Sequence, residues 1–161
     1  MFVVVTGCAG SVDPLPGYTR ASDGERASVM RTIEDYYARR ERAALTGDTS
    51  VLFAAYTELA DGEDRSKGIN VDAFFVQRMR AIGILGLTHD IEANEPVGVY
   101  VSDSNAVAFV HGRYSWQNPH GPSTIGEFYT RIDLVRHVGG WLPVRTDEVE
   151  LHERPPRTPR G

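Results

Sequence analysis

Apolar residues recur at helical spacing in the first half of the chain and at strand spacing in the second half. Ser22 followed by Glu25 has the pattern of a helix capping box, and apolar residues then recur at intervals of three and four. Gly47 predicts the end of this helix, because glycine readily adopts the left-handed conformation that closes helices. The same spacing predicts a shorter second helix over residues 51–56 and a third helix over residues 70–82.

Beyond residue 84, apolar residues alternate with polar ones, which is the pattern of strands with one buried face. Breaks rich in glycine, proline, asparagine and aspartate separate the runs and predict turns. Helices that precede a run of antiparallel strands indicate an α+β fold, in which three N-terminal helices cover the apolar face of the sheet. The predicted strands are residues 87–94, 99–101, 107–111, 128–135 and 141–151.

Composition and charge narrow the possible functions. The chain has 161 residues, of which 41% are hydrophobic and 24% are charged, as expected for one globular domain. The net charge of −5 argues against a nucleic-acid partner, since phosphate binding requires clustered positive charge. No apolar run approaches the roughly 20 residues of a membrane-spanning helix. The single cysteine excludes an internal disulfide and a multi-cysteine zinc site, and we expect no metal or cofactor.

The first 21 residues contain a candidate lipid-attachment site at Cys8. The segment Val5-Thr6-Gly7-Cys8 resembles the lipobox of bacterial lipoproteins, in which an aliphatic residue and two small residues precede the lipid-bearing cysteine. Residues 1–8 are then the remnant of a lipoprotein signal, and residues 9–21 form a flexible tether with two prolines and two glycines. This interpretation predicts a protein of the cell envelope, lipid-anchored to the outer face of the cytoplasmic membrane.

This segment has two alternative interpretations. Residues 3–11 also resemble the strand and glycine turn of a dinucleotide-binding motif, but Pro14 and Pro16 prevent the helix that should follow. An incidental Cys8 in a disordered N-terminus is the other alternative, and it is compatible with a cytoplasmic protein. No positive residue precedes Cys8, and the apolar stretch is shorter than the roughly 7–15 residues of a secretory signal. Residues 153–161 are predicted to form a disordered, basic, proline-rich tail.

The domain over residues 22–152 resembles NTF2-like proteins, which include SnoaL-like polyketide cyclases and ketosteroid isomerase. One motif is the end of the first helix, Ala43-Ala44-Leu45-Thr46-Gly47-Asp48, followed by a short helix with Leu52-Phe53-Ala54. The other is Arg131 and Asp133 before Gly139-Gly140-Trp141, which resembles the last hairpin of these proteins. The resemblance implies a cone in which a curved antiparallel sheet and helices enclose a pocket. It also implies a homodimer formed through the open face of the sheet.

In the isomerases of this family, a proton-shuttling carboxylate follows the second helix, and an ungapped count places Asp61 at that position. A carboxylate in a dry pocket has a raised proton affinity and can move a proton next to a carbonyl group. By the same count the isomerase tyrosine of the first helix falls on Arg40, and the second acid falls near Asp133 on a polar strand face. The alternative is that Asp61 lies in a solvated loop, because its neighbours are polar.

Strand alternation places His89 and His111 on the apolar faces of their strands, so both are expected to point into the pocket. There an imidazole can act as acid, base or hydrogen-bond donor near neutral pH. The alternative for each is a core histidine bonded to a backbone carbonyl. The aromatic residues that we expect to contact a ligand, or alternatively to pack in the core or line an interface, are Tyr36, Tyr37, Phe109, Trp116 and Phe128.

These observations leave two functions open. The first is a non-catalytic domain, anchored in the envelope through Cys8, that binds a small apolar ligand or a protein partner. The second is a cofactor-free enzyme of the SnoaL-like or isomerase kind. In that enzyme Asp61, His89 and His111 supply acid and base for chemistry on a cyclic carbonyl compound.

Overall fold

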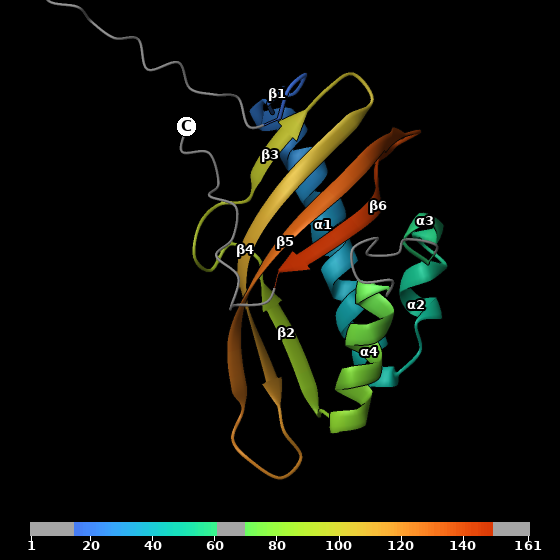
Figure 1. Ribbon diagram of the computed structural model, residues 1–161, viewed down its shortest axis with the longest axis vertical. Helices are drawn as coiled ribbons and strands as arrows, with labels where there is room; N and C mark the ends of the chain where they lie inside the picture. Colours follow the sequence, from blue (N-terminus) through green and yellow to red (C-terminus); the bar gives the residue numbers. More distant parts are fainter. Residues whose placement is uncertain (1–14, 61–69, 150–161) are drawn as a thin grey trace, which may run out of the picture.

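The computed structural model describes residues 15–60 and 70–149, and it confirms the α+β fold (Figure 1). Helices pack on one face of a curved, antiparallel, six-stranded sheet. The helices are α1 (Asp23–Thr46), α2 (Ser50–Phe53), α3 (Thr57–Ala60) and α4 (Val71–Ile82). The strands are β1 (Thr19–Arg20), β2 (Gly86–Asp90), β3 (Gly98–Val101), β4 (Asn105–Gln117), β5 (Thr124–His137) and β6 (Gly140–Val149).

Both long helices begin and end at the signals present in the sequence. The Ser22 hydroxyl accepts from the backbone N–H of Glu25, and the Glu25 carboxylate accepts from the backbone N–H of Ser22, which completes the capping box of α1. Gly47 closes α1 with a φ of 72°. Asn70 caps α4, and Gly83 closes it with the same left-handed conformation. These boundaries confirm the predicted first and third helices.

The second helix, predicted over residues 51–56, is α2 and ends at Phe53. A turn at residues 54–55 follows, and α3 forms a separate short helix that was not predicted. Leu52, Tyr56 and Leu59 of this segment are all buried in the core. The Tyr56 hydroxyl donates to Asp35 of α1 and fixes this segment.

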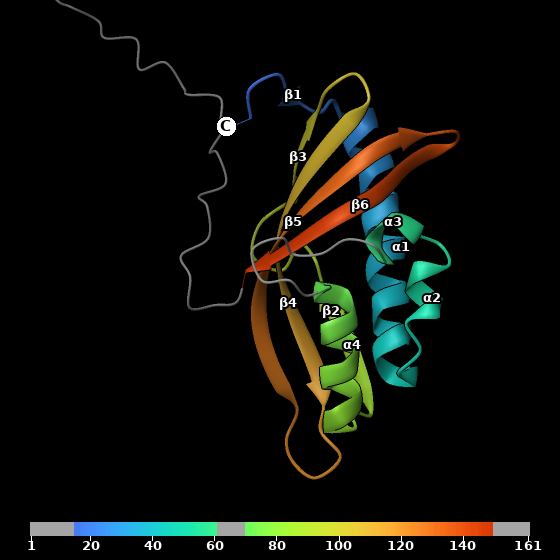
Figure 2. The same cartoon turned by 45° about the vertical axis from the view of Figure 1, so that its right-hand side comes forward.

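Strand β4 organises the sheet, because three other strands pair with it. Its first half pairs with β3, its second half pairs with β2, and β5 runs along its full length. The sheet curves around the helices, and α1 packs against α4, β2 and β6 (Figure 2). The core lies between α1 and the inner face of this sheet. Among residues 15–60 and 70–149, no helix is both long and apolar enough to cross a membrane.

The sheet begins earlier than the sequence suggested. Thr19 and Arg20 pair with Val101 and Tyr100 of β3, and the backbone N–H of Ala21 donates to Val99. The end of the segment predicted as a tether is therefore a strand, and the start expected at residue 22 is corrected to residue 19. A tether cannot be identified from composition alone when a short edge strand supplies few side chains to the core.

Candidate functional site

The inner face of α1 carries polar groups into the core. Helical spacing places two tyrosines and an arginine on the same stripe as the apolar residues that face the sheet. Arg40 is 1% exposed, although it is surrounded in sequence by solvated charges. The buried residues of this stripe are Val29, Met30, Ile33, Tyr36, Tyr37, Arg40, Ala43 and Ala44.

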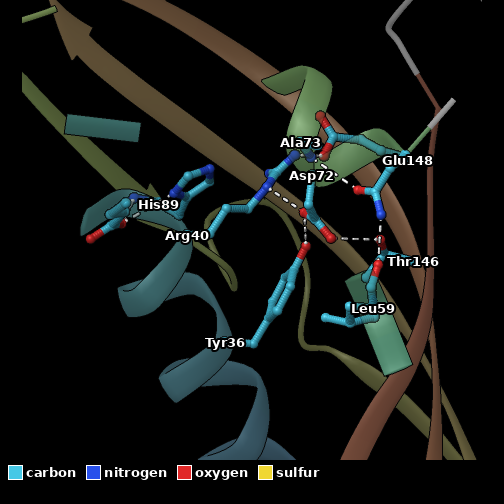
Figure 3. Close-up of polar contacts among 10 residues, drawn as sticks. Tyr36, Arg40, Leu59, Asp72, Ala73, His89, Thr146 and Glu148 are labelled. Atoms are coloured by element: carbon cyan, nitrogen blue, oxygen red, sulfur yellow. Dashed lines mark hydrogen bonds and ion pairs between the residues drawn. The ribbon is translucent and has the colours of Figure 1, made fainter. Parts of the chain in front are cut away.

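Arg40 bridges two carboxylates from different elements (Figure 3). Its Nε lies 3.0 Å from Oδ1 of Asp72 on α4, and its Nη2 lies 2.5 Å from Oε2 of Glu148 on β6. Asp72 is 2% exposed, so the Arg40–Asp72 pair is fully withdrawn from water. Such a pair is stable only when its geometry is good and its remaining polar atoms are bonded.

Two hydroxyl groups meet that requirement at Asp72. The Tyr36 hydroxyl donates to Oδ1 at 2.6 Å, and the Thr146 hydroxyl donates to Oδ2 at 3.1 Å (Figure 3). Both oxygens of the carboxylate are thereby bonded. We call Tyr36, Arg40, Asp72, Thr146 and Glu148 the Arg40 network; it ties α1, α4 and β6 together.

His89 lies next to this network but is held by a different partner. Its side chain is fully buried, and its Nδ1 lies 3.1 Å from Oε1 of Glu41 on α1. The same Glu41 oxygen accepts the backbone N–H of His89 at 2.6 Å. Burial lowers the pKa of His89 below its ordinary value of 6.5, and the hydrogen bond to Glu41 offsets only part of that effect. The imidazole is therefore neutral at neutral pH, and its buried Nε2 has no hydrogen-bond partner among the described residues.

Two further side chains, Tyr37 and Thr130, have buried hydroxyl groups without a well-formed hydrogen bond among the described residues. Tyr37 and Thr130 are each 3% exposed, and neither hydroxyl has a well-formed hydrogen bond within the described parts of the chain. Burial raises the pKa of Tyr37 well above its ordinary value, and the nearby Arg40 cation and Thr130 hydroxyl offset only part of that rise. Tyr37 is therefore a neutral phenol. We call Tyr37, His89 and Thr130 the Tyr37 group.

Aromatic rings surround the Tyr37 group. The centroid of the Tyr37 ring lies 4.9 Å from that of His89, and both rings lie 5.5 Å from Phe128. Two glycines allow rings to lie close to the sheet: a Cβ at Gly112 would approach Phe128 to 2.4 Å, and one at Gly126 would approach Tyr114 to 2.4 Å. Rings therefore cover the strand backbone where a side chain would otherwise stand.

The Tyr37 group offers hydrogen bonds of both kinds in an aromatic setting. A phenol and a secondary alcohol each donate and accept, whereas the bare Nε2 of a neutral imidazole accepts only. A buried polar atom without a hydrogen bond costs about 1–3 kcal/mol, and Tyr37 and His89, whose rings lie 4.9 Å apart, carry two such atoms. No group of three or more metal-ligating side chains occurs in residues 15–60 and 70–149.

The structure brings together four of the residues expected to form the site. Tyr36 and Tyr37 from α1, His89 from β2 and Phe128 from β5 are all buried in the space between helix and sheet. Of these, the Tyr36 hydroxyl is hydrogen-bonded to Asp72, whereas the rings of the other three pack against one another. Asp61 and Cys8 lie outside the described residues.

The predicted inward orientation of His111 and Phe109 is wrong. His111 pairs with Tyr129 across β4 and β5, and the two rings stack at 3.8 Å on the outer face of the sheet. Its nitrogens each lie 3.6 Å from a carboxylate oxygen, of Glu95 and Glu127. Phe109 shares that outer face and packs edge-on against Tyr100, so neither residue reaches the interior.

Trp116, which was expected to contact a ligand, lies outside the Tyr37 group. Trp116 stacks on Tyr114 at 5.0 Å, with the rings nearly parallel, but it packs in a second apolar cluster with Leu87 and Met79. Its indole N–H donates to Asn118 in the β4–β5 hairpin. Trp116 thus lies one ring away from the Tyr37 group.

Sequence reasoning missed Glu41, Asp72 and Thr130 and did not identify Arg40 as buried. Arg40 follows Tyr36 by four positions and Ile33 by seven, and this spacing on an apolar stripe is a signal of a buried charge. Glu41 has a similar relation to Tyr37. No local signal identifies Asp72, because its partners lie far away in the sequence, whereas Thr130 alternates with the apolar residues Phe128 and Ile132.

No protein-family model matches the chain, and no curated protein matches it. A solved NTF2-like protein with a cystatin-like fold from Novosphingobium aromaticivorans has a TM-score of 0.55 and 24% identity. That match covers 80% of this chain and 82% of the other.

Two further solved structures have the same arrangement. One from Novosphingobium aromaticivorans bears the name "Putative Scytalone Dehydratase"; its TM-score is 0.52 at 17% identity, covering 83% of this chain and 94% of the other. One from Catenulispora acidiphila has a TM-score of 0.52 at 17% identity, covering 77% of this chain and 92% of the other. The chain has the NTF2-like, cystatin-like fold that its sequence motifs predicted.

Proposed function

Starting from a chain with the NTF2-like fold, we propose that this domain binds a small, largely apolar ring compound beside the Tyr37 group. The observation that carries the proposal is the set of buried, unpartnered atoms on Tyr37, His89 and Thr130. The aromatic rings around them provide the apolar contact area, and the polar atoms orient the ligand. The Arg40 network supports this site by fixing α1 against α4 and β6.

Native and denaturing mass spectra of the purified full-length protein test this function. We expect an additional mass in the native spectrum that is lost on denaturation. The bound fraction should fall in Tyr37→Phe, which removes an unpartnered hydroxyl, and should persist in Tyr36→Phe, whose hydroxyl bonds to Asp72. Absence of a bound mass, even after incubation with an organic extract of the expressing cells, would contradict the proposal and favour a protein partner.

A second candidate is a cofactor-free acid/base enzyme acting on a cyclic carbonyl compound. It is favoured by the neutral, buried imidazole of His89 beside the neutral phenol of Tyr37. A bare Nε2 can remove a proton next to a carbonyl, and a phenol can stabilise the resulting enolate oxygen. One fold neighbour bears the name of a dehydratase, an activity that also requires an acid and a base. Asp61 is the further acid/base residue that the isomerase resemblance implies.

Exchange of the α-protons of 2-tetralone in D₂O, followed by NMR, tests the enzymatic alternative. The protein should accelerate exchange, and His89→Gln should reduce the acceleration by about 10²–10⁴-fold, the usual contribution of a general base. Asp61→Asn distinguishes the roles, because it should slow exchange only if Asp61 shares the proton transfer. Exchange at the rate of buffer alone would leave ligand binding as the function.

Lipid anchorage at Cys8 is part of the proposed function of the binding domain. The lipobox-like segment before Cys8 supports it, and the anchor would hold the domain on the outer face of the cytoplasmic membrane. Labelling of bacterial cells with an alkyne-bearing fatty acid should mark the protein when its gene is expressed with the upstream reading frame. Equal labelling of Cys8→Ala would rule the anchor out and leave a cytoplasmic protein as the alternative.

We also propose a homodimer formed through the outer face of the sheet. That face presents the stacked pair His111–Tyr129 and the pair Phe109–Tyr100, and aromatic side chains are enriched at interfaces. Light scattering at tens of micromolar protein should give twice the monomer mass, and Tyr129→Glu should give the monomer mass. A monomer mass for the unsubstituted protein would refute the dimer.

A further inference from the structure

Glu41 contacts His89 and determines which nitrogen of the imidazole carries the proton. One oxygen, Oε1, accepts from the His89 backbone N–H at 2.6 Å and lies 3.1 Å from Nδ1. A carboxylate oxygen accepts hydrogen bonds and does not donate them, so Nδ1 must carry the proton. In a neutral imidazole, the other nitrogen then has a free lone pair. Glu41 thereby selects the tautomer in which Nε2 is the acceptor.

The surroundings of Nε2 determine which kind of ligand this tautomer can bind. Nε2 is buried and lies among the rings of Tyr37, Phe75, Tyr114 and Phe128. The charged groups that act on His89 from the packed elements are Arg40, Glu41 and Glu148. Arg40 is bonded to Asp72 and Glu148, and Oε1 of Glu41 is occupied by His89 itself.

We propose that Glu41 is a positioning residue that holds His89 Nε2 as a hydrogen-bond acceptor, so that the site selects a neutral ring compound bearing a hydroxyl group, such as a phenol or an enol. This inference rests on the proposed ligand-binding function and names its chemical class. The ligand hydroxyl donates to Nε2, and its oxygen accepts from the hydroxyl of Tyr37, whose ring packs against His89. Both of these unpartnered atoms are then used, since Nε2 needs a donor and the Tyr37 hydroxyl can supply one to the ligand oxygen.

An anionic or a purely apolar ligand fits this site less well. A ligand carboxylate would face the lone pair of Nε2 and the nearby carboxylates of Glu41 and Glu148. A ring without a donor would fill the same volume but leave Nε2 unbonded. A site whose polar atoms require a hydroxyl group rejects an analogue that lacks it, because its buried atoms are then left unpaired.

The tautomer is measured directly by ¹⁵N–¹H correlation NMR of the histidine rings in the full-length protein. His89 is assigned as the signal absent from His89→Phe. The unsubstituted protein and Glu41→Gln, which retains an acceptor oxygen, should show the proton on Nδ1. Glu41→Met should shift the population toward Nε2–H, and Glu34→Met, at an exposed position of the same helix, should not. A proton on Nε2 in the unsubstituted protein would overturn the assignment even if Glu41→Met does not fold.

The ligand class is tested with 2-naphthol and 2-fluoronaphthalene, two probes of nearly equal size of which only the first donates a hydrogen bond. Calorimetry should show that 2-naphthol binds at least tenfold more tightly. Glu41→Met should remove this preference, and Glu41→Gln should preserve it. Equal affinities would overturn the hydroxyl selection while leaving the proposed binding function intact. Failure of both probes to bind would contradict the proposed function itself, and the NMR result would still decide the role of Glu41.

Discussion

The Arg40 network and the Tyr37 group occupy adjacent parts of the same core, but they differ in how their polar atoms are bonded. In the Arg40 network the almost fully buried Asp72 carboxylate accepts two hydrogen bonds and pairs with the Arg40 guanidinium, which also donates to Glu148, although Arg40 Nε has no well-formed hydrogen bond of its own within the described parts of the chain. In the Tyr37 group, three buried polar atoms have no hydrogen bond among the described residues. The contrast is sharpest between the neighbouring residues Tyr36 and Tyr37. It indicates that one region maintains the fold and the other is available to a ligand.

Arg40→Met should produce the largest loss of stability. The substitution leaves Asp72 and Glu148 without their cation, and an uncompensated buried charge costs about 3–5 kcal/mol. Urea unfolding followed by circular dichroism measures the change. The matched control is Arg39→Met, which breaks a largely exposed pair with Asp35 and should cost no more than about 1 kcal/mol. Similar losses for both variants would show that the buried network contributes no more to the free energy of unfolding than an exposed ion pair.

Tyr36→Phe should cost less than Arg40→Met but remain clearly measurable. It removes a 2.6 Å hydrogen bond to a buried carboxylate, and hydrogen bonds to charged groups contribute about 1.5–3 kcal/mol. The same urea titration gives the value. A double-mutant cycle with Thr146→Val should show coupling, because both hydroxyls donate to Asp72. Strict additivity in this cycle would argue against a connected network.

The pH dependence of stability should report the buried His89. Its pKa in the folded protein is lowered by burial, so the unfolded chain binds a proton more readily below about pH 6.5, the ordinary value. Unfolding then takes up a proton, and the free energy of unfolding decreases as the pH falls from 6.5 toward the lower folded-state pKa. In His89→Phe this part of the decrease should be absent. His137→Phe, an exposed control, should retain it; identical curves for all three proteins would contradict a neutral buried His89.

The fold followed from the sequence where the signals were local. The capping box at Ser22, the closing glycine Gly47 and the third helix over residues 70–82 depend on neighbouring residues, and each was found where it was predicted. The orientation of β4 was not predictable in this way. Every residue from 106 to 110 is apolar, so alternation does not distinguish its faces, and only pairing with β5 turns His111 outward.

The candidate site depended on contacts that no local pattern contains. Tyr36 and Asp72 are 36 residues apart, and Arg40 and Glu148 are 108 residues apart. The sequence did place His89, Tyr36, Tyr37 and Phe128 on inward faces, because their own helix or strand shows a clear period. Whether a buried hydroxyl has a partner is decided by packing, as the difference between Tyr36 and Tyr37 shows.

The free energy of unfolding of Tyr37→Phe tests the central distinction most directly, and its expected change is the smallest. Removing a hydroxyl that has no partner should leave the stability in urea unchanged or raise it by up to about 1 kcal/mol, because the cost of burying that group is relieved. The shape of the ring is retained, so no cavity contributes to the result. A loss of more than about 1 kcal/mol, comparable to that of Tyr36→Phe, would show that the Tyr37 hydroxyl is part of the structural network and would contradict a ligand site at this position.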